Sequence, residues 1–401
     1  MKKVFPVDKL IEKIFEVSNL AIGEKVVVHE PYFKNTNALN YVSQCINSGW
    51  VSTAGEWVNK FENQICDYTG SKFAVAVSNG TVALRLALFV SGVKNDEEVI
   101  MPPLSFVATA NSVSHLGAIP HFVDIEPHSL GLCPFALQKR LEEIAEKKNG
   151  KVFNKHTGKR IAAVIPVHVF GSPAKISEIK KICNIWEIPL VEDAAEALGS
   201  WVKFKKSLKH CGTFGDVSII SFNGNKIIST GGGGVLITDN SLLATKARHL
   251  STTAKAPHPW AFEHDEIAWN DRLPNVNAAI GSSQMEVLEE RLKLKRKLYE
   301  KYCQKLNCFE GLEVIKENSN CINNNWLVSI RLTINNQNEL KEIRDKILNI
   351  AHSKNLFLRP SWNLINSFKM YKDVPAGDLK IAQDQSFRII NLPSSPQLLI
   401  K

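Results

Sequence analysis

The chain has 401 residues, of which 44% are hydrophobic and 22% charged, and a formal net charge of +9 at pH 7. This length suits one large domain and a smaller one, and no stretch approaches the ~18 consecutive apolar residues of a membrane-spanning helix. Its basic residues alternate with acids, as in 289–302 (EERLKLKRKLYEKY), a pattern typical of solvated helix faces rather than of a nucleic-acid groove.

The cysteines give no sign of a metal site. All eight are scattered singly, without a CxxC pair or a histidine-rich knuckle, so we expect no zinc and no other metal. Free thiols in a chain of this size favour a reducing, cytoplasmic location. The first residues carry acids among the apolar positions, which is unlike a secretory signal. They predict instead an amphipathic helix with Leu10, Ile11, Ile14 and Phe15 on one side.

The next elements predict an α/β domain. After a short strand at 25–28, helices are expected at 37–47 and 61–68. Apolar strands then alternate with helical patterns, and this order predicts a mostly parallel central sheet covered by helices on both faces. The strands are expected within 73–77, 97–103, 119–125, 160–171, 188–196, 217–222 and 233–239, and the helices within 81–92, 106–117, 134–148 and 176–187.

The chain changes character near residue 270. Residues 277–301 predict one long charged helix, and the remainder resembles a smaller α+β unit. The polar segment 148–160 predicts an exposed loop or hairpin. We therefore expect an N-terminal helical extension (1–25), a large domain (26–275) and a small C-terminal domain (276–401).

Polar residues lie at the carboxyl ends of several predicted strands. Parallel α/β sheets bind their ligands at these ends. Gly80 and Thr81 open a helix after the first of these strands, which indicates either a phosphate cradle or an ordinary helix cap. Neither GxxxxGK[ST] nor a GxGxxG following a strand is present, so a P-loop and a dinucleotide fingerprint are both excluded.

Two ionisable residues follow later strands. Asp193 ends the apolar run IPLVED, where a carboxylate needs a cation such as a pyridinium nitrogen unless it is an exposed acid or a helix cap. Lys226 lies within 218–239 (SIISFNGNKIISTGGGGVLITD), on a short polar step between two apolar runs. It is either a partly buried amine suited to imine chemistry or a lysine in a surface turn.

Other candidates have two interpretations each. Phe106 either stacks on a flat ring or belongs to the core, and His168 either contacts a substrate oxygen or is a satisfied strand-end histidine. Trp50 and Ser52 precede a glycine loop that forms either an active-site wall or simple packing. A phosphate cradle, an aromatic ring, an acid and an amine along one sheet together match the needs of pyridoxal 5′-phosphate.

At this point the sequence resembles the DegT family of pyridoxal phosphate-dependent sugar aminotransferases, which have the aspartate aminotransferase (type I) fold. The resemblance runs from about residue 27 to the C-terminus. Its motifs are GWVSTAGEWVNKFE (49–62), SNGTVALRLAL (78–88), PPLSFVATANSV (102–113), PVHVFGSP (166–173), VEDAAEALGS (191–200), SFNGNKIISTGGGG (221–234) and WNDRLPNVNAAIG (269–281).

The resemblance implies a role for each matching residue. Lys226 would form the Schiff base, and Asp193 would pair with the pyridinium nitrogen. Asn270 matches a residue that reaches the phosphate of the neighbouring subunit, which implies a homodimer with shared sites. Glu196 departs from the family, because many members carry Gln or His at this position, near the phenolic oxygen. The remaining implied contacts are to the phosphate, from Gly80, Thr81 and Ser221, and to the ring, from Phe106.

The implied reaction moves an amino group from an amino acid, L-glutamate, to the C4 keto group of a nucleotide-linked 4-keto-6-deoxy sugar for surface-glycan synthesis. The segments 154–160, 251–260 and 264–275 resemble a subgroup of the legionaminic-acid and bacillosamine pathways, which points to UDP-2-acetamido-2,6-dideoxy-4-hexulose. A GDP-linked, perosamine-type keto sugar and a non-catalytic, regulatory sugar-binding protein are the alternatives. A same-fold dehydratase carries histidine in place of Lys226, and a nicotinamide-dependent reductase needs the glycine fingerprint that this chain lacks.

Overall fold

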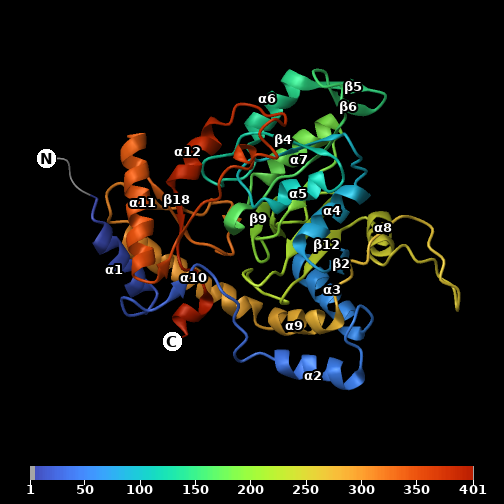
Figure 1. Cartoon of the computed structure of the whole chain (residues 1–401), viewed down its shortest axis with the longest axis horizontal. Helices are drawn as coiled ribbons and strands as arrows, with labels where there is room; N and C mark the ends of the chain where they lie inside the picture. The colour runs from blue at the N-terminus through green and yellow to red at the C-terminus, as the bar shows by residue number, and fades with distance from the viewer. Residues whose placement is uncertain (1–4, 401) are drawn as a thin grey trace.

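A mostly parallel sheet forms the centre of the computed structural model, which describes residues 5–400 (Figure 1). Its strands form two ladders, in the orders β2-β12-β11-β8 and β4-β3-β7, and parallel bridges from Val164 to Leu190 and from Val167 to Asp193 join them. Only β12 runs antiparallel to its neighbours. The strands are β2 (Phe73–Val77), β3 (Glu98–Met101), β4 (Ile119–Phe122), β7 (Ile161–Val164), β8 (Val191–Asp193), β11 (Val217–Ser221) and β12 (Gly234–Thr238).

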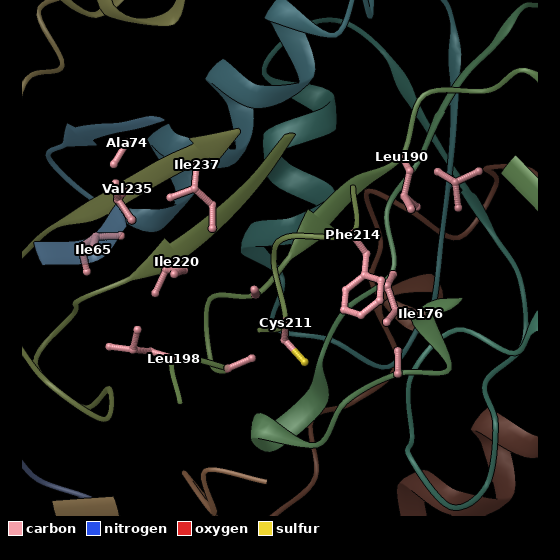
Figure 2. Packing of buried hydrophobic residues seen from close by; sticks show 14 of the residues in the cluster. Ile65, Ala74, Ile176, Leu190, Leu198, Cys211, Phe214, Ile220, Val235 and Ile237 are labelled. Atoms are coloured by element: carbon pink, nitrogen blue, oxygen red, sulfur yellow. The ribbon is translucent and has the colours of Figure 1, made fainter. Parts of the chain in front are cut away.

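Helices cover both faces of this sheet because its strands are apolar on both sides. In β2, Val75 and Val77 enter the core under α4, α5 and α8, whereas Ala74 and Ala76 enter the core under α3, α6, α7 and α9. Figure 2 shows the core under α3, α6, α7 and α9, with Ala74, Val235 and Ile237 of the sheet near Ile65 of α3. The helices are α2 (Ala38–Ser48), α3 (Glu56–Thr69), α4 (Gly80–Val90), α5 (Ala108–Ser114), α6 (Pro134–Ile144), α7 (Ile176–Trp186), α8 (Ser241–Ser251) and α9 (Asn275–Met285). The α/β prediction is confirmed.

Smaller antiparallel pieces flank this body. The polar segment predicted as a loop or hairpin is a hairpin of β5 (Ala145–Lys148) and β6 (Lys151–Asn154). The helix expected over 134–148 therefore ends earlier, at Ile144, because the chain turns into β5. A second small sheet has the order β10-β9-β14 and comprises β9 (Trp201–Phe204), β10 (Ser207–His210) and β14 (Cys321–Ile322).

The C-terminal elements build an antiparallel sheet of order β13-β15-β18-β17 with helices packed against it. The single long helix expected over 277–301 is wrong: α9 ends at Met285 and α10 begins at Leu288. Val287, with a φ of −112° and a ψ of 5°, leaves the helical conformation between them. The elements are α10 (Leu288–Leu306), β13 (Leu312–Val314), β15 (Ser329–Leu332), α11 (Gln337–Ser353), β16 (Leu356–Phe357), β17 (Arg359–Pro360), α12 (Lys380–Arg388) and β18 (Ile389–Asn391).

The N-terminal stretch packs on this C-terminal body. The helix α1 (Val7–Val17) lies against α10 and α11, and β1 (Val26–Val27) pairs in parallel with β16 (Figure 1). Leu10, Ile11, Ile14 and Phe15, expected on one face, are all buried in the core that α1 shares with α10, α11 and β15. The first strand therefore joins the C-terminal body instead of entering the large domain.

Leu10→Ala tests whether α1 is part of the folded core. The Leu10 side chain is fully buried, so its truncation should lower the free energy of unfolding by about 2–5 kcal/mol. Urea denaturation measures this loss, with exposed Lys9→Ala on the same helix as the control. If both variants unfold at the wild-type urea concentration, α1 does not stabilise the protein.

Candidate active site

A cavity of about 540 Å³ lies where β2, β8 and β11 end and where the C-terminal body meets the sheet. The residues that line the cavity include Asn79, Gly80, Thr81, Phe106, Thr109, Asp193, Glu196, Ser221 and Lys226 from the large body, and Trp326, Arg359 and Trp362 from the C-terminal body.

Within residues 5–400, no group of three or more His, Cys, Asp or Glu side chains is arranged to hold a metal ion. Likewise, no helix in the described part of the chain has the length and apolarity to cross a bilayer.

The start of α4 forms one end of the cavity. The Asn79 side chain caps the helix by accepting a hydrogen bond from the Val82 amide at 2.9 Å. The next residue is glycine because β11 packs against it: a Cβ on Gly80 would lie 2.8 Å from the Ser221 Cβ. Helix N-termini carry unpaired N–H groups and a positive dipole end, so this corner is suited to a phosphate.

Gly80→Ala should weaken this phosphate corner. Because the added methyl must push the Ser221 side chain away, we expect the dissociation constant for pyridoxal phosphate to rise by about tenfold, the effect of losing about one charge-assisted hydrogen bond. Equilibrium titration of the cofactor-free protein with pyridoxal phosphate measures this dissociation constant. Gly377→Ala is the matched control, since a Cβ there meets its nearest neighbour at an ordinary 3.6 Å. Equal affinity in the two variants would contradict the assignment of this corner.

Asp193 ends β8 and faces the cavity with only 5% of its surface exposed. Thr109 donates a hydrogen bond to its Oδ2 at 2.8 Å, and the Ala195 amide donates one to its Oδ1 at 3.2 Å. Burial raises the pKa of Asp193, and the Thr109 hydroxyl and the Lys226 charge offset this only in part. No Lys, Arg or His within residues 5–400 forms an ion pair with Asp193, and its carboxylate borders the cavity.

Lys226 lies in the turn after β11 and is enclosed. Its Nζ is 3.0 Å from Glu196 Oε1 and 4.1 Å from the centroid of the Trp326 ring, and only 12% of its side chain is exposed. The alternative of a lysine in a surface turn is therefore wrong. The amine faces the same cavity as Asp193.

Glu196 is the acid nearest to this amine. Its Oε2 accepts a hydrogen bond from the Phe170 amide at 2.8 Å, while Oε1 pairs with Lys226. Burial raises the pKa of Glu196, whereas the nearby Lys226 charge favours the ionised form. Glu196, the one departure from the residue pattern that the resemblance implies, thus forms an ion pair with the lysine.

These groups fit the pyridoxal phosphate that the sequence resemblance implies. A phosphate would fit the corner at Gly80, and a protonated ring nitrogen would supply a cation for the Asp193 carboxylate. The enclosed Lys226 amine is available for an aldehyde. Phe106 borders the same cavity with 54% of its surface exposed, which leaves a ring face free for stacking.

The other predicted residues lie away from this cavity. Trp50 lines a second pocket with Asn275, whose backbone amide donates a hydrogen bond to the Ser52 carbonyl at 2.6 Å. Asn270 is exposed and pairs with Thr252 in a single β-bridge. None of Trp50, Ser52 and Asn270 lines the cavity at the ends of β2, β8 and β11.

A substrate contact by His168 is contradicted by its burial. The side chain is fully buried, its Nε2 lies 2.9 Å from Glu192 Oε2, and its Nδ1 accepts a hydrogen bond from the Ala174 amide. Burial alone would raise the pKa of Glu192, but hydrogen bonds from His168 and from backbone amides outweigh it, so this pKa lies below the usual range. His168 therefore stabilises the buried carboxylate of Glu192, a residue of β8 itself.

Sequence reasoning missed several cavity residues. Thr109 could have been found, because it lies three residues after Phe106, about one helical turn along the same predicted helix. Trp326, Arg359 and Trp362 carried no such signal, since only the folded C-terminal body brings them to the sheet.

Comparisons with known proteins identify the family of the chain. The DegT/DnrJ/EryC1/StrS aminotransferase family matches residues 34–400. GDP-perosamine synthase of Vibrio cholerae is 33% identical over 374 residues, covering 93% of this chain and 95% of that protein. The aminotransferase TlmJ from Streptoalloteichus hindustanus superposes with a TM-score of 0.81 at 27% identity, covering 92% of this chain and 94% of TlmJ.

A further solved structure, NtdA from Bacillus subtilis with the bound cofactor PMP, has the same fold, with a TM-score of 0.74 at 23% identity over 98% of this chain and 80% of NtdA. The family match extends over both bodies of the chain and over every residue that lines the cavity beyond position 34. The chain therefore belongs to the DegT/DnrJ/EryC1/StrS aminotransferase family, and it is a pyridoxal phosphate-dependent aminotransferase.

Proposed function

We propose that this enzyme transfers an amino group from an amino acid, L-glutamate, to the C4 keto group of a nucleotide-linked 4-keto-6-deoxy sugar, for the synthesis of surface glycans. One observation carries the chemistry: the Lys226 amine and the buried Asp193 carboxylate face one cavity whose end is the helix N-terminus at Gly80. We place the reaction in the cytoplasm, in line with the free state of the cysteines.

The chain's own residues would hold the cofactor at three points. Gly80, Thr81 and Ser221 would bind its phosphate, and Asp193 would keep its ring nitrogen protonated. Phe106 would cover one face of the ring. When bound, pyridoxal phosphate supplies an aldehyde that takes up the amino group and a ring that accepts electrons.

Lys226 would transfer the protons, and Glu196 would position its amine. Lys226 would form the covalent link to the cofactor and, once released by the donor, move a proton as general base and then as general acid. Glu196 lies 3.0 Å from the amine and would hold its ammonium form in place between these steps.

The substrates are anionic, and the C-terminal body offers a cation for them. Arg359 lines the cavity and is exposed, and its guanidinium forms no ion pair with any residue of the described range 5–400. We propose that it faces a carboxylate or phosphate of the substrates, because a guanidinium binds such groups through paired hydrogen bonds.

A second copy of the chain would complete the site. Large apolar side chains are exposed around the second pocket and on the 252–270 loop, including Trp50 (59%), Trp260 (81%) and Ile267 (92%). Clusters of such residues mark interaction surfaces. We propose a homodimer in which Asn270 reaches the phosphate in the partner subunit, and Trp50 and Ser52 border the substrate there.

Two sugar classes have support. The segments 154–160, 251–260 and 264–275 favour a UDP-linked acetamido sugar, UDP-2-acetamido-2,6-dideoxy-4-hexulose. The similarity to GDP-perosamine synthases, 33% and 34% identical in Vibrio cholerae and Escherichia coli O157:H7, favours a GDP-linked sugar instead. We propose the UDP-linked sugar first and the GDP-linked sugar as the second candidate.

Mass spectrometry separates these candidates. The purified holoenzyme is incubated with L-glutamate and, one at a time, UDP- and GDP-linked 4-keto-6-deoxy sugars. We expect one sugar class to gain an amine while glutamate becomes 2-oxoglutarate. If simple keto acids are aminated and no nucleotide sugar is, the proposed substrate class is wrong. If no acceptor is aminated, the acceptor lies outside both sugar classes.

A further inference from the structure

The turn that carries Lys226 is held by a tryptophan from the other body of the protein. We propose that Trp326 is the positioning residue of Lys226: its indole fixes both the backbone before the lysine and the amine at its tip. This inference rests on the proposed role of Lys226 as the residue that bonds to the cofactor.

Trp326 makes two contacts with this turn. Its Nε1–H donates a hydrogen bond to the Asn225 carbonyl at 2.7 Å, directly before Lys226 in the chain. Its ring lies under the lysine, with Nζ 4.1 Å from the ring centroid, within the range of a cation–π interaction. One side chain therefore sets where the lysine leaves the backbone and where its amine ends.

The turn needs such a support. Asn223 is exposed, Asn225 and Lys226 are only partly buried, and a Cβ on Gly224 would meet no atom within 4 Å. Within the turn, the Lys226 backbone amide donates a hydrogen bond to the Asn223 carbonyl at 3.0 Å. Local contacts of this kind leave the direction of a long lysine side chain free.

Trp326 itself is rigidly placed. It is 3% exposed, its backbone amide donates to Asn324 Oδ1 at 2.8 Å, and its carbonyl accepts from the buried Lys295 at 3.2 Å. Asn324 in turn donates to the Glu196 carbonyl at 2.7 Å. Residues 324–326 thus hold both partners of the ion pair in the cavity: Asn324 binds the backbone of Glu196, and Trp326 contacts the amine of Lys226.

This geometry affects one chemical step. The Lys226 nitrogen adds to the aldehyde carbon of the cofactor, and the aldehyde oxygen leaves as water together with the two protons that the nitrogen gives up. Holding two reacting groups in place raises the rate of such a step. Trp326 acts through Lys226 and needs no contact with the cofactor for this effect.

The test compares two forms of the cofactor. Cofactor-free wild type, Trp326→Phe and Trp326→Leu are mixed with pyridoxal phosphate, which bonds to Lys226, or with pyridoxamine phosphate, which has no aldehyde and uses only the other contacts. Trp326→Phe keeps an aromatic face and loses the N–H donor, whereas Trp326→Leu loses both. Trp186→Phe, a partly buried tryptophan outside the cavity, is the control.

We expect the rate of covalent capture of pyridoxal phosphate to fall in Trp326→Phe and to fall further, by about tenfold, in Trp326→Leu. The affinity for pyridoxamine phosphate and the capture rate of Trp186→Phe should stay at the wild-type value. Trp326→Phe is the mild change, so it keeps the test decisive if Trp326→Leu does not fold.

Two results would overturn the inference. Wild-type capture rates in both Trp326 variants would show that the indole does not position Lys226. A parallel loss of pyridoxamine phosphate affinity would show a merely structural role. If the wild type itself forms no bond at Lys226, the proposed function fails first, and that result is distinct from either of these.

Discussion

Lys226→Ala is expected to lower kcat for transamination by roughly 10⁴-fold, the upper end of what one general acid–base group contributes. In the proposed mechanism, the variant loses both the covalent link to the cofactor and the base that moves the proton. The protein itself should still fold, because the Lys226 amine lies at the cavity, beside Glu196 and the ring of Trp326, and not in the hydrophobic core. Turnover is measured as 2-oxoglutarate formed from glutamate in the presence of the accepted nucleotide sugar.

A matched control separates this effect from a general loss of charge. Lys151→Ala removes an exposed lysine from β6 of the hairpin, outside the cavity, and should keep the wild-type kcat. Substantial turnover by Lys226→Ala with the same acceptor would mean that another group performs the proton transfer.

Asp193→Asn is expected to reduce kcat/KM by roughly 10²- to 10³-fold, the range observed when one electrostatic group is removed from an active site. Asparagine has nearly the same shape and can still accept the Thr109 hydrogen bond, but it carries no charge to keep the ring nitrogen protonated. Steady-state kinetics with glutamate as the varied substrate measure the loss. Asp373→Asn, at an exposed carboxylate, is the control.

Asp193→Asn lowers activity, but it should stabilise the folded cofactor-free protein at neutral pH relative to wild type. Burial raises the pKa of Asp193 above its value in the unfolded chain, so the folded state binds the proton more tightly. The free energy of unfolding therefore falls as pH rises from about 4, the unfolded value, through the raised pKa of the folded state. Asp193→Asn removes this contribution.

Thermal unfolding of the cofactor-free proteins at acidic and at neutral pH checks the sign. The Tm of Asp193→Asn relative to wild type should rise between these conditions, and pyridoxal phosphate should raise the Tm of wild type more than that of the variant. A variant less stable than wild type at neutral pH, with an unchanged response to the cofactor, would contradict a buried acid waiting for a cation.

The sheet and the cofactor side of the cavity could be predicted from the sequence because both are local. Apolar runs such as 73–77 and 217–221 form strands wherever both faces are covered, and the residue after such a strand lies at the sheet edge. Gly80 and Lys226 lie a few residues after β2 and β11, and Asp193 is the last residue of β8. Their meeting in one cavity follows from the strand order.

The remaining features depend on contacts between distant segments. The pattern of charges continues through 286–287, so it did not show that α9 ends at Met285. The short strand at Val26–Val27 finds its partner at β16, more than three hundred residues later. Trp326 reaches Lys226 only because the C-terminal body folds over the edge of the sheet, and no local pattern in 321–330 indicates this.

Chemical reduction of the holoenzyme tests the central claim most directly. The protein saturated with pyridoxal phosphate is treated with borohydride, which makes a covalent link permanent, then digested and analysed by tandem mass spectrometry. The account predicts a pyridoxyl phosphate group on the peptide that contains Lys226, at that lysine. A label on a different lysine, or no label at all, would contradict it.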